Sequence, residues 1–281
     1  VPLGMLTHAQ SRDYADAEAL YRATISRDPQ SWMAHNNLAV LMLRDSPERA
    51  LGHLEQALRA NPAYPEAHNN RGLALQLLER FDEASAAHAE AIRLEPTFAE
   101  AHNNRGTALQ KLNRLPDAEA AYREALRLRP ESLQARVNLG NVMLELGVPE
   151  EAIVHYRAAL AIDPGLADVH FMLGAALERT GRLDEATAQY QETLRLQPSA
   201  ADAHLALGNA WYRAGDYARA AAAYEAAVRL APDSPDARNN YGAALERLGR
   251  TDEAAAQYRE AVRLAPDSAG ARANLARVKK R

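Results

Sequence analysis

Apolar and small residues recur along this chain at positions that fit one face of a helix. The sixth, ninth, tenth and thirteenth residues after certain prolines form one set. After Pro198 these residues are His204, Leu207, Gly208 and Trp211. At 100° per residue the four positions lie on a single stripe. The intervening segments are rich in Ala, Leu, Glu, Arg and Gln, and none alternates with the period of two typical of a half-buried strand. We therefore predict that every segment is helical.

Prolines divide the chain at regular intervals. Eight of them, called the phased prolines below, are separated by 33 residues once and by 34 residues six times: Pro29, Pro62, Pro96, Pro130, Pro164, Pro198, Pro232 and Pro266. Three others, Pro47, Pro116 and Pro149, fall about halfway through a period. Because a proline belongs at a helix boundary or in a first turn, each period should hold two helices of roughly a dozen residues.

Small and large residues keep the same period. Glycine occupies the tenth place after six phased prolines, as Gly72, Gly106, Gly140, Gly174, Gly208 and Gly242. Alanine stands twelve residues before every phased proline, as Ala17, Ala50, Ala84, Ala118, Ala152, Ala186, Ala220 and Ala254. Eight residues before the phased proline stand Tyr21, Tyr122, Tyr156, Tyr190, Tyr224 and Tyr258, with Leu54 and His88 in the other two periods. We predict that a bulky ring of each second helix packs against the small residues of the first.

These residues together resemble the tetratricopeptide repeat, whose 34-residue pattern runs Trp, Leu-Gly, Tyr, Ala, an aromatic residue and Pro. The resemblance covers essentially the whole chain, although His or Arg replaces the leading Trp. It implies an all-α fold, an α-solenoid in which antiparallel helix pairs form a right-handed superhelix. The predicted divisions are a partial N-terminal repeat at 1–31, repeats at 32–64, 65–98, 99–132, 133–166, 167–200, 201–234 and 235–268, and a C-terminal capping helix at 269–281.

Composition and motifs narrow the function. Lys and Arg number 33 against 37 Asp and Glu, so the formal charge of −4 gives no electrostatic reason to bind nucleic acid or an anionic membrane. The chain has no cysteine, and no apolar run approaches the ~20 residues of a membrane span. The motifs GxxxxGKS/T, GxGxxG, HExxH and GxSxG are absent. We predict a protein that is not an enzyme and needs no cofactor, and we expect the cytoplasm, with the periplasm or another compartment left open.

Repeated histidines and arginines suggest a metal site or a basic stripe. Five histidines share the sixth place: His35, His68, His102, His170 and His204. Helices pack ~8–10 Å apart, whereas metal–nitrogen bonds measure ~2.0–2.1 Å, so we interpret these histidines as packing residues and predict no metal. Arginines also stand three residues before six phased prolines, and four of them have a glutamate three residues upstream. That spacing favours ion pairs on a solvated helix face.

Asparagines form the most informative row. The eighth place holds Asn37, Asn70, Asn104, Asn138, Asn240 and Asn274, and the seventh place holds Asn36, Asn69, Asn103 and Asn239. We expect both places to point away from the buried stripe. Asparagine is a poor residue for a helix interior, so the row needs a cause. One interpretation is hydrogen bonding within a helix or between repeats. The other is peptide binding, because a side-chain amide can pair with both N–H and C=O of an extended backbone.

The resemblance favours the second interpretation. Similar arrays, notably the repeat domain of O-GlcNAc transferase, carry an asparagine row on the concave face that holds extended peptides. The row here is interrupted by Met172 and Ala206. A cationic clamp for acidic tails is not expected, since the fourth place is acidic in Glu66, Glu100, Asp168, Asp202 and Asp236.

We therefore predict a non-catalytic scaffold that binds an extended peptide or a partner protein, with no nucleic acid, no membrane insertion and no particular oligomeric state implied. The alternative is the substrate-recruiting arm of a glycosyltransferase similar to O-GlcNAc transferase.

Overall fold

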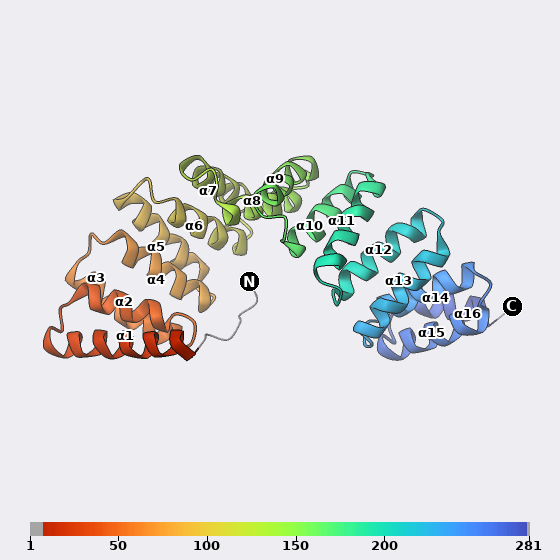
Figure 1. Ribbon diagram of the computed structural model, residues 1–281, viewed down its shortest axis with the longest axis horizontal. Helices are drawn as coiled ribbons and strands as arrows, with labels where there is room; N and C mark the ends of the chain where they lie inside the picture. The colour runs from red at the N-terminus through yellow and green to blue at the C-terminus, as the bar shows by residue number, and fades with distance from the viewer. Residues whose placement is uncertain (1–7, 280–281) are drawn as a thin grey trace. The chain divides into compact units, whose positions relative to one another are not determined.

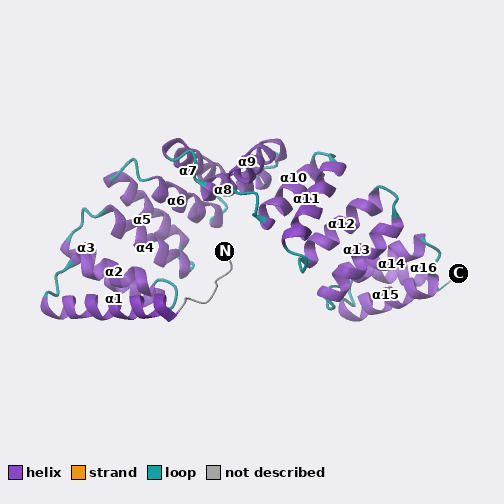
Figure 2. Ribbon diagram, viewed as in Figure 1, coloured by secondary structure: helices purple, strands orange, loops and turns teal. Residues whose placement is uncertain are grey.

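The computed structural model describes the backbone of residues 8–279 and the side chains of residues 17–279. These residues form sixteen α-helices joined by short turns, and no strand occurs among them (Figures 1 and 2). The helices group into two compact units, one ending at Leu146 and the other beginning at Gly147. The predicted all-α repeat fold is confirmed. The division between the units falls inside the predicted repeat 133–166.

The first unit contains the red to green helices of Figure 1: α1 (His8–Arg27), α2 (Trp32–Met42), α3 (Pro47–Ala60), α4 (Pro65–Leu77), α5 (Phe81–Leu94), α6 (Ala99–Lys111), α7 (Leu115–Leu128) and α8 (Leu133–Glu145). Each helix packs against the next one in the chain, and α2, α4, α6 and α8 also contact one another in that order. The first helices of successive repeats therefore lie side by side in this unit.

The second unit contains the green to blue helices: α9 (Pro149–Ile162), α10 (Ala167–Arg179), α11 (Leu183–Leu196), α12 (Ala201–Arg213), α13 (Tyr217–Leu230), α14 (Pro235–Arg247), α15 (Thr251–Leu264) and α16 (Ala269–Val278). Its helices pack in the same consecutive manner, with additional contacts between α12 and α14 and between α14 and α16. The same turn recurs between paired helices, where Gly181 and Gly249 adopt φ values of 78° and 77°. Glycine reaches this left-handed region without the steric cost that a side chain adds.

Rings pack closely on glycines in several of the helix pairs. A Cβ atom added to Gly106 would lie 2.6 Å from a ring carbon of Tyr122, and one added to Gly174 would lie 2.5 Å from a ring carbon of Tyr190. Tyr122 is completely buried, as is Ala118 one turn before it. Burial raises the pKa of Tyr122 to about 12 because the charged phenolate is disfavoured away from water. The predicted contact between large and small residues is thus confirmed.

Helix α16 begins at Ala269 and packs against α14 and α15. It buries Ala271 and Val278, and Arg277 forms two hydrogen bonds of 3.0 and 2.7 Å to the carboxylate of Glu246 on α14. That carboxylate is only 8% exposed and also accepts a bond from the Tyr258 hydroxyl. An ion pair therefore ties α16 to the preceding repeat.

Candidate functional site

The asparagines lie on the first helix of each repeat, but they are less exposed than the sequence suggested. Asn36, Asn69, Asn103 and Asn104 are buried, with exposed fractions between 2% and 7%. The other six are half-buried. The expectation that both places point away from the buried surface was therefore wrong. A helical wheel shows which face of a single helix is apolar, but it does not include the neighbouring repeats. In the stacked array the next repeat also covers a second face of each first helix.

This second face carries hydrogen bonds from several repeats to the one before. In both units an eighth-place Nδ2 donates to the Oδ1 of a seventh-place asparagine in the preceding repeat. We call each such bond an asparagine rung. The rungs measure 2.9 Å for Asn70 to Asn36, 3.1 Å for Asn104 to Asn69, 3.1 Å for Asn138 to Asn103 and 2.9 Å for Asn274 to Asn239. Inter-repeat bonding, one of the two interpretations of the row, thus exists.

The rungs explain why the residue at the seventh place of one repeat is related to the residue at the eighth place of the next. Wherever the seventh place is asparagine, the eighth place of the following repeat is asparagine too. Where the seventh place is apolar, as at Phe171, the following eighth place is apolar, as at Ala206. Leu205 is the exception, because Asn240 follows it. This pairing between repeats is the signal in the sequence from which the burial of the row could have been predicted.

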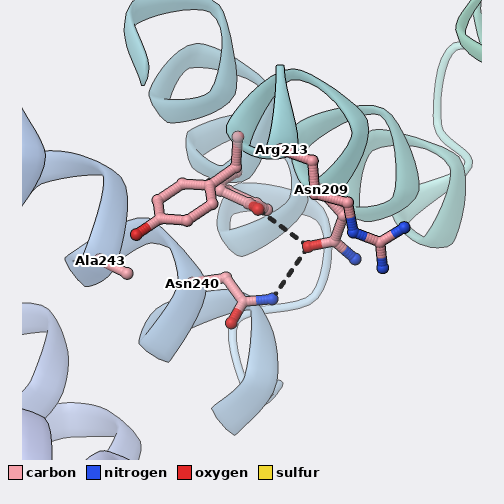
Figure 3. A pocket seen from close by; sticks show the side chains of 6 residues that line it. Asn209, Arg213, Asn240 and Ala243 are labelled. Carbon is pink, nitrogen blue, oxygen red and sulfur yellow. Dashed lines mark hydrogen bonds between the residues drawn. The ribbon is translucent and has the colours of Figure 1, made fainter. Parts of the chain in front are cut away.

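A residue outside the predicted row resolves the exception. Asn240 donates to Oδ1 of Asn209 at 3.1 Å, and the Tyr224 hydroxyl donates to the same oxygen at 2.8 Å (Figure 3). Together with Tyr212, Arg213 and Ala243, these residues line a pocket of about 340 Å³. Burial raises the pKa of Tyr224, and the neighbouring Tyr212 raises it further. Asn209 lies one turn beyond Leu205 on α12, so its amide reaches the place that a seventh-place asparagine would fill.

A buried network surrounds the rung of Asn69. Its Oδ1 accepts from Nδ1 of His88 at 2.9 Å as well as from Asn104. Gln76 lies 3.1 Å from Nε2 of His88 and donates to the backbone oxygen of Asn104 at 2.7 Å. His88 is fully buried, and that burial, with Arg105 as a smaller cause, lowers the pKa of His88 to about 3. The histidine is therefore neutral and serves as a second donor to Asn69.

The ten predicted asparagines differ in the hydrogen-bonding capacity they keep. Among the described residues, Asn70 and Asn138 make only their rung bond, so each retains one N–H and its Oδ1. Asn37 and Asn240 accept from their seventh-place neighbours Asn36 and Asn239 at 3.1 and 3.3 Å. Asn104 both accepts and donates, and it is buried. Across the described side chains, Asn70 and Asn138 are consequently the members of the first unit's row whose Oδ1 accepts no hydrogen bond while their Nδ2 is held by a rung.

The sixth-place histidines have a structural partner. In all five, Nε2 lies 2.9–3.2 Å from the carbonyl oxygen of the phased proline six residues earlier. Arg136 and Arg238 form the same bond with their guanidinium groups. Within residues 17–279, no group of three or more His, Asp or Glu side chains is arranged to hold a metal ion. Hydrogen bonding to the preceding turn thus accounts for these residues.

Charged side chains lie near the ends of many helices. Arg93, Arg127, Arg195 and Arg263 pair with the glutamate three residues upstream at 2.6–2.7 Å, so the predicted ion pairs are confirmed. Each arginine hydrogen bond lowers the pKa of the glutamate that accepts it. The fourth-place acids are exposed in first turns of helices: Glu66, Glu100, Asp168, Asp202 and Asp236.

Sequence comparison agrees with this geometry. The family model of the tetratricopeptide repeat matches residues 6–46, 44–97, 75–132, 103–167, 171–235 and 212–269. The chain belongs to the tetratricopeptide repeat family. Such arrays are typical of protein–protein interaction. No functionally curated protein is significantly similar to this tetratricopeptide chain in sequence.

Several solved structures share the tetratricopeptide fold. PilF of Pseudomonas aeruginosa is 21% identical, with a TM-score of 0.65 over 80% of this chain and 97% of PilF. YrrB, described as a TPR protein with an unusual peptide-binding site, is 23% identical, with a TM-score of 0.59 over 66% of this chain and 95% of YrrB. MamA is 25% identical, with a TM-score of 0.56 over 58% of this chain and 96% of MamA.

No helix within the described part of the chain is both long and apolar enough to span a bilayer. The alternative of a glycosyltransferase arm stays a prediction.

Proposed function

We propose that this tetratricopeptide array is a non-catalytic scaffold that binds an extended segment of a partner protein along the eighth-place asparagines of α2, α4, α6 and α8. The observation that carries the proposal is the unused capacity of Asn70 and Asn138. Each amide is half-buried, is held by a rung to the preceding repeat, and keeps one N–H and one carbonyl oxygen. Those two groups complement the C=O and N–H of a peptide backbone whatever its side chains.

The spacing of the row suits an extended chain. First helices of adjacent repeats lie side by side, and packed helices are ~8–10 Å apart. An extended peptide rises ~3.3 Å per residue, so one asparagine would meet it about every three residues. Four repeats in the first unit would then engage a segment of about ten residues. The similarity of fold to YrrB, a TPR protein with a peptide-binding site, supports a peptide as the ligand.

The rungs also reduce the cost of binding. A free asparagine side chain must be ordered when it engages a ligand, and immobilising such a side chain costs ~0.5–1.5 kcal/mol. The rung bonds of Asn70 and Asn138 already restrict their amides before a peptide arrives. We therefore assign these two residues the main part in holding the backbone, and Asn104, which is buried beside Gln76, a smaller one.

The test is selection from a library of random twelve-residue peptides, followed by calorimetric titration of the tightest peptide. We expect the double variant Asn70→Ala/Asn138→Ala to bind about 5- to 150-fold more weakly, because each lost hydrogen bond contributes ~0.5–1.5 kcal/mol. Gln56→Ala, which removes an exposed amide from α3, is the matched control and should bind like wild type. Equal affinity of the double variant, in a protein that retains its helical circular dichroism, would refute the proposal.

A further inference from the structure

The rungs give three eighth-place amides of the first unit, those of Asn70, Asn104 and Asn138, the same direction. Nδ2 of Asn70, Asn104 and Asn138 points to the preceding repeat in each case, where it meets Asn36, Asn69 and Asn103 respectively. An asparagine amide without such a partner can turn its oxygen and nitrogen end for end. Here that reversal would place Oδ1 against another Oδ1, two acceptors without a proton between them. The carbonyl oxygen of each amide therefore lies on the side away from the preceding repeat.

This order is reinforced where two asparagines are adjacent in the sequence. Nδ2 of Asn103 donates to Oδ1 of Asn104 at 3.4 Å, so Asn138, Asn103, Asn104 and Asn69 form a continuous chain of donors and acceptors. His88 closes the chain by donating to Asn69. Reversing one amide would break the bonds on both sides of it. The buried seventh-place asparagines thus act as positioning residues for the half-buried eighth-place ones.

A peptide has a direction of its own. In an extended chain, one residue presents its N–H and its C=O along the same edge, and the N–H comes first from the N-terminus. An asparagine that pairs with both groups donates from Nδ2 to the C=O and accepts the N–H at Oδ1. At Asn70 and Asn138, Nδ2 lies on the side of the preceding repeat. The peptide C=O must then lie toward α2 and the peptide N–H toward α8.

We propose that the asparagine rungs impose one direction on the bound segment, so that it runs opposite to the repeats, with its N-terminus toward α8 and its C-terminus toward α2. The inference rests on the proposed function, since it concerns the same row. It adds a selectivity that the amides alone would not have, because an unpositioned asparagine accepts a backbone in either direction.

Two methionines serve as reporters of this direction. Met33 lies exposed on α2, and Met143 lies buried on α8, at opposite ends of the row. The selected twelve-residue peptide is prepared with a nitroxide label at its N-terminus or at its C-terminus, and each form is added to protein carrying ¹³C-methyl methionine. We expect the C-terminal label to broaden the Met33 signal and the N-terminal label to broaden the Met143 signal.

The opposite pattern, or equal broadening of both signals by both labels, would overturn the inferred direction while leaving the peptide-binding proposal intact. The affinity of Asn70→Ala/Asn138→Ala for the same peptide separates the two failures. If that affinity equals the wild-type value, the peptide does not use the row, and the proposed function fails together with the direction. If the affinity falls and the broadening follows the expected pattern, both stand.

Discussion

Replacing Asn69 by alanine tests the rungs as part of the fold. Its side chain is 2% exposed, and its Oδ1 accepts from Asn104 at 3.1 Å and from His88 at 2.9 Å. Alanine would leave two buried donors without an acceptor, at ~1–3 kcal/mol for each. Alanine is the better helix former by up to ~0.7 kcal/mol. The free energy of unfolding should therefore fall by about 1–5 kcal/mol.

The assay is urea unfolding followed by circular dichroism, together with amide hydrogen exchange along the whole chain. Exchange is needed because stability in a repeat array is distributed along the chain and local openings precede global unfolding. We expect faster exchange in α4, α5 and α6 and little change in the second unit. Asn37→Ala is the matched control, because this half-buried asparagine only accepts one bond from its neighbour Asn36 and should lose no more than ~1 kcal/mol.

A double-mutant cycle separates the rung from other effects of the substitution. If Asn69 and Asn104 act through their shared bond, the double alanine variant should be less destabilised than the sum of the single variants by about 1 kcal/mol. An Asn69→Ala protein as stable as wild type, or more stable, would refute the reasoning. That result is what a row of exposed asparagines would give.

Four other substitutions test separate parts of the packing. Burial holds the pKa of His88 at about 3, below its ordinary value of 6.5, so between these pH values the unfolded state binds one more proton and stability falls as the pH drops. The wild-type protein should therefore lose about 2 kcal/mol of unfolding free energy between pH 6.5 and 5, and His88→Tyr should abolish this loss, as measured by urea unfolding at both pH values. Gly106→Ala should lower stability by ~1–3 kcal/mol because the added Cβ meets the Tyr122 ring. Gly52→Ala, whose added Cβ meets nothing within 4 Å, should instead raise stability by ~0.5–1 kcal/mol. Equal melting temperatures of the two variants would contradict this difference. Arg277→Met should loosen α16 by ~1–3 kcal/mol, seen as faster amide exchange confined to the last repeat, since it removes two charged hydrogen bonds to α14.

The repeat itself could be predicted from the sequence because its determinants are local and recur. Prolines mark helix starts at Pro65 and Pro235 directly. The spacing between Gly106 and Tyr122 places a small residue opposite a ring within one helix pair, and that contact depends only on two adjacent helices. The helix from Ala269 could be predicted for the same reason, as it repeats the pattern of every first helix.

The burial of the asparagines could not be predicted in this way. It depends on the rotation of one repeat against the next, which a 34-residue period does not specify. Asn69 and Asn103 are covered by the following first helix, and no helical wheel drawn on a single repeat contains that helix. Asn209 was missed for a related reason. It stands at a different place in the period and substitutes for a seventh-place asparagine only because the two positions lie one turn apart on α12.

The proposed function depends on the binding of a peptide backbone to the eighth-place amides. It is tested most directly by titrating the selected peptide into ¹⁵N-labelled protein while observing the side-chain amide signals of asparagine. We expect the signals of Asn70 and Asn138 to shift as the peptide saturates the protein, while the signal of Asn61, whose side chain accepts from the backbone N–H of Ala63 at the end of α3, stays unchanged. Saturation of the protein by the peptide with Asn70 and Asn138 unmoved would contradict it.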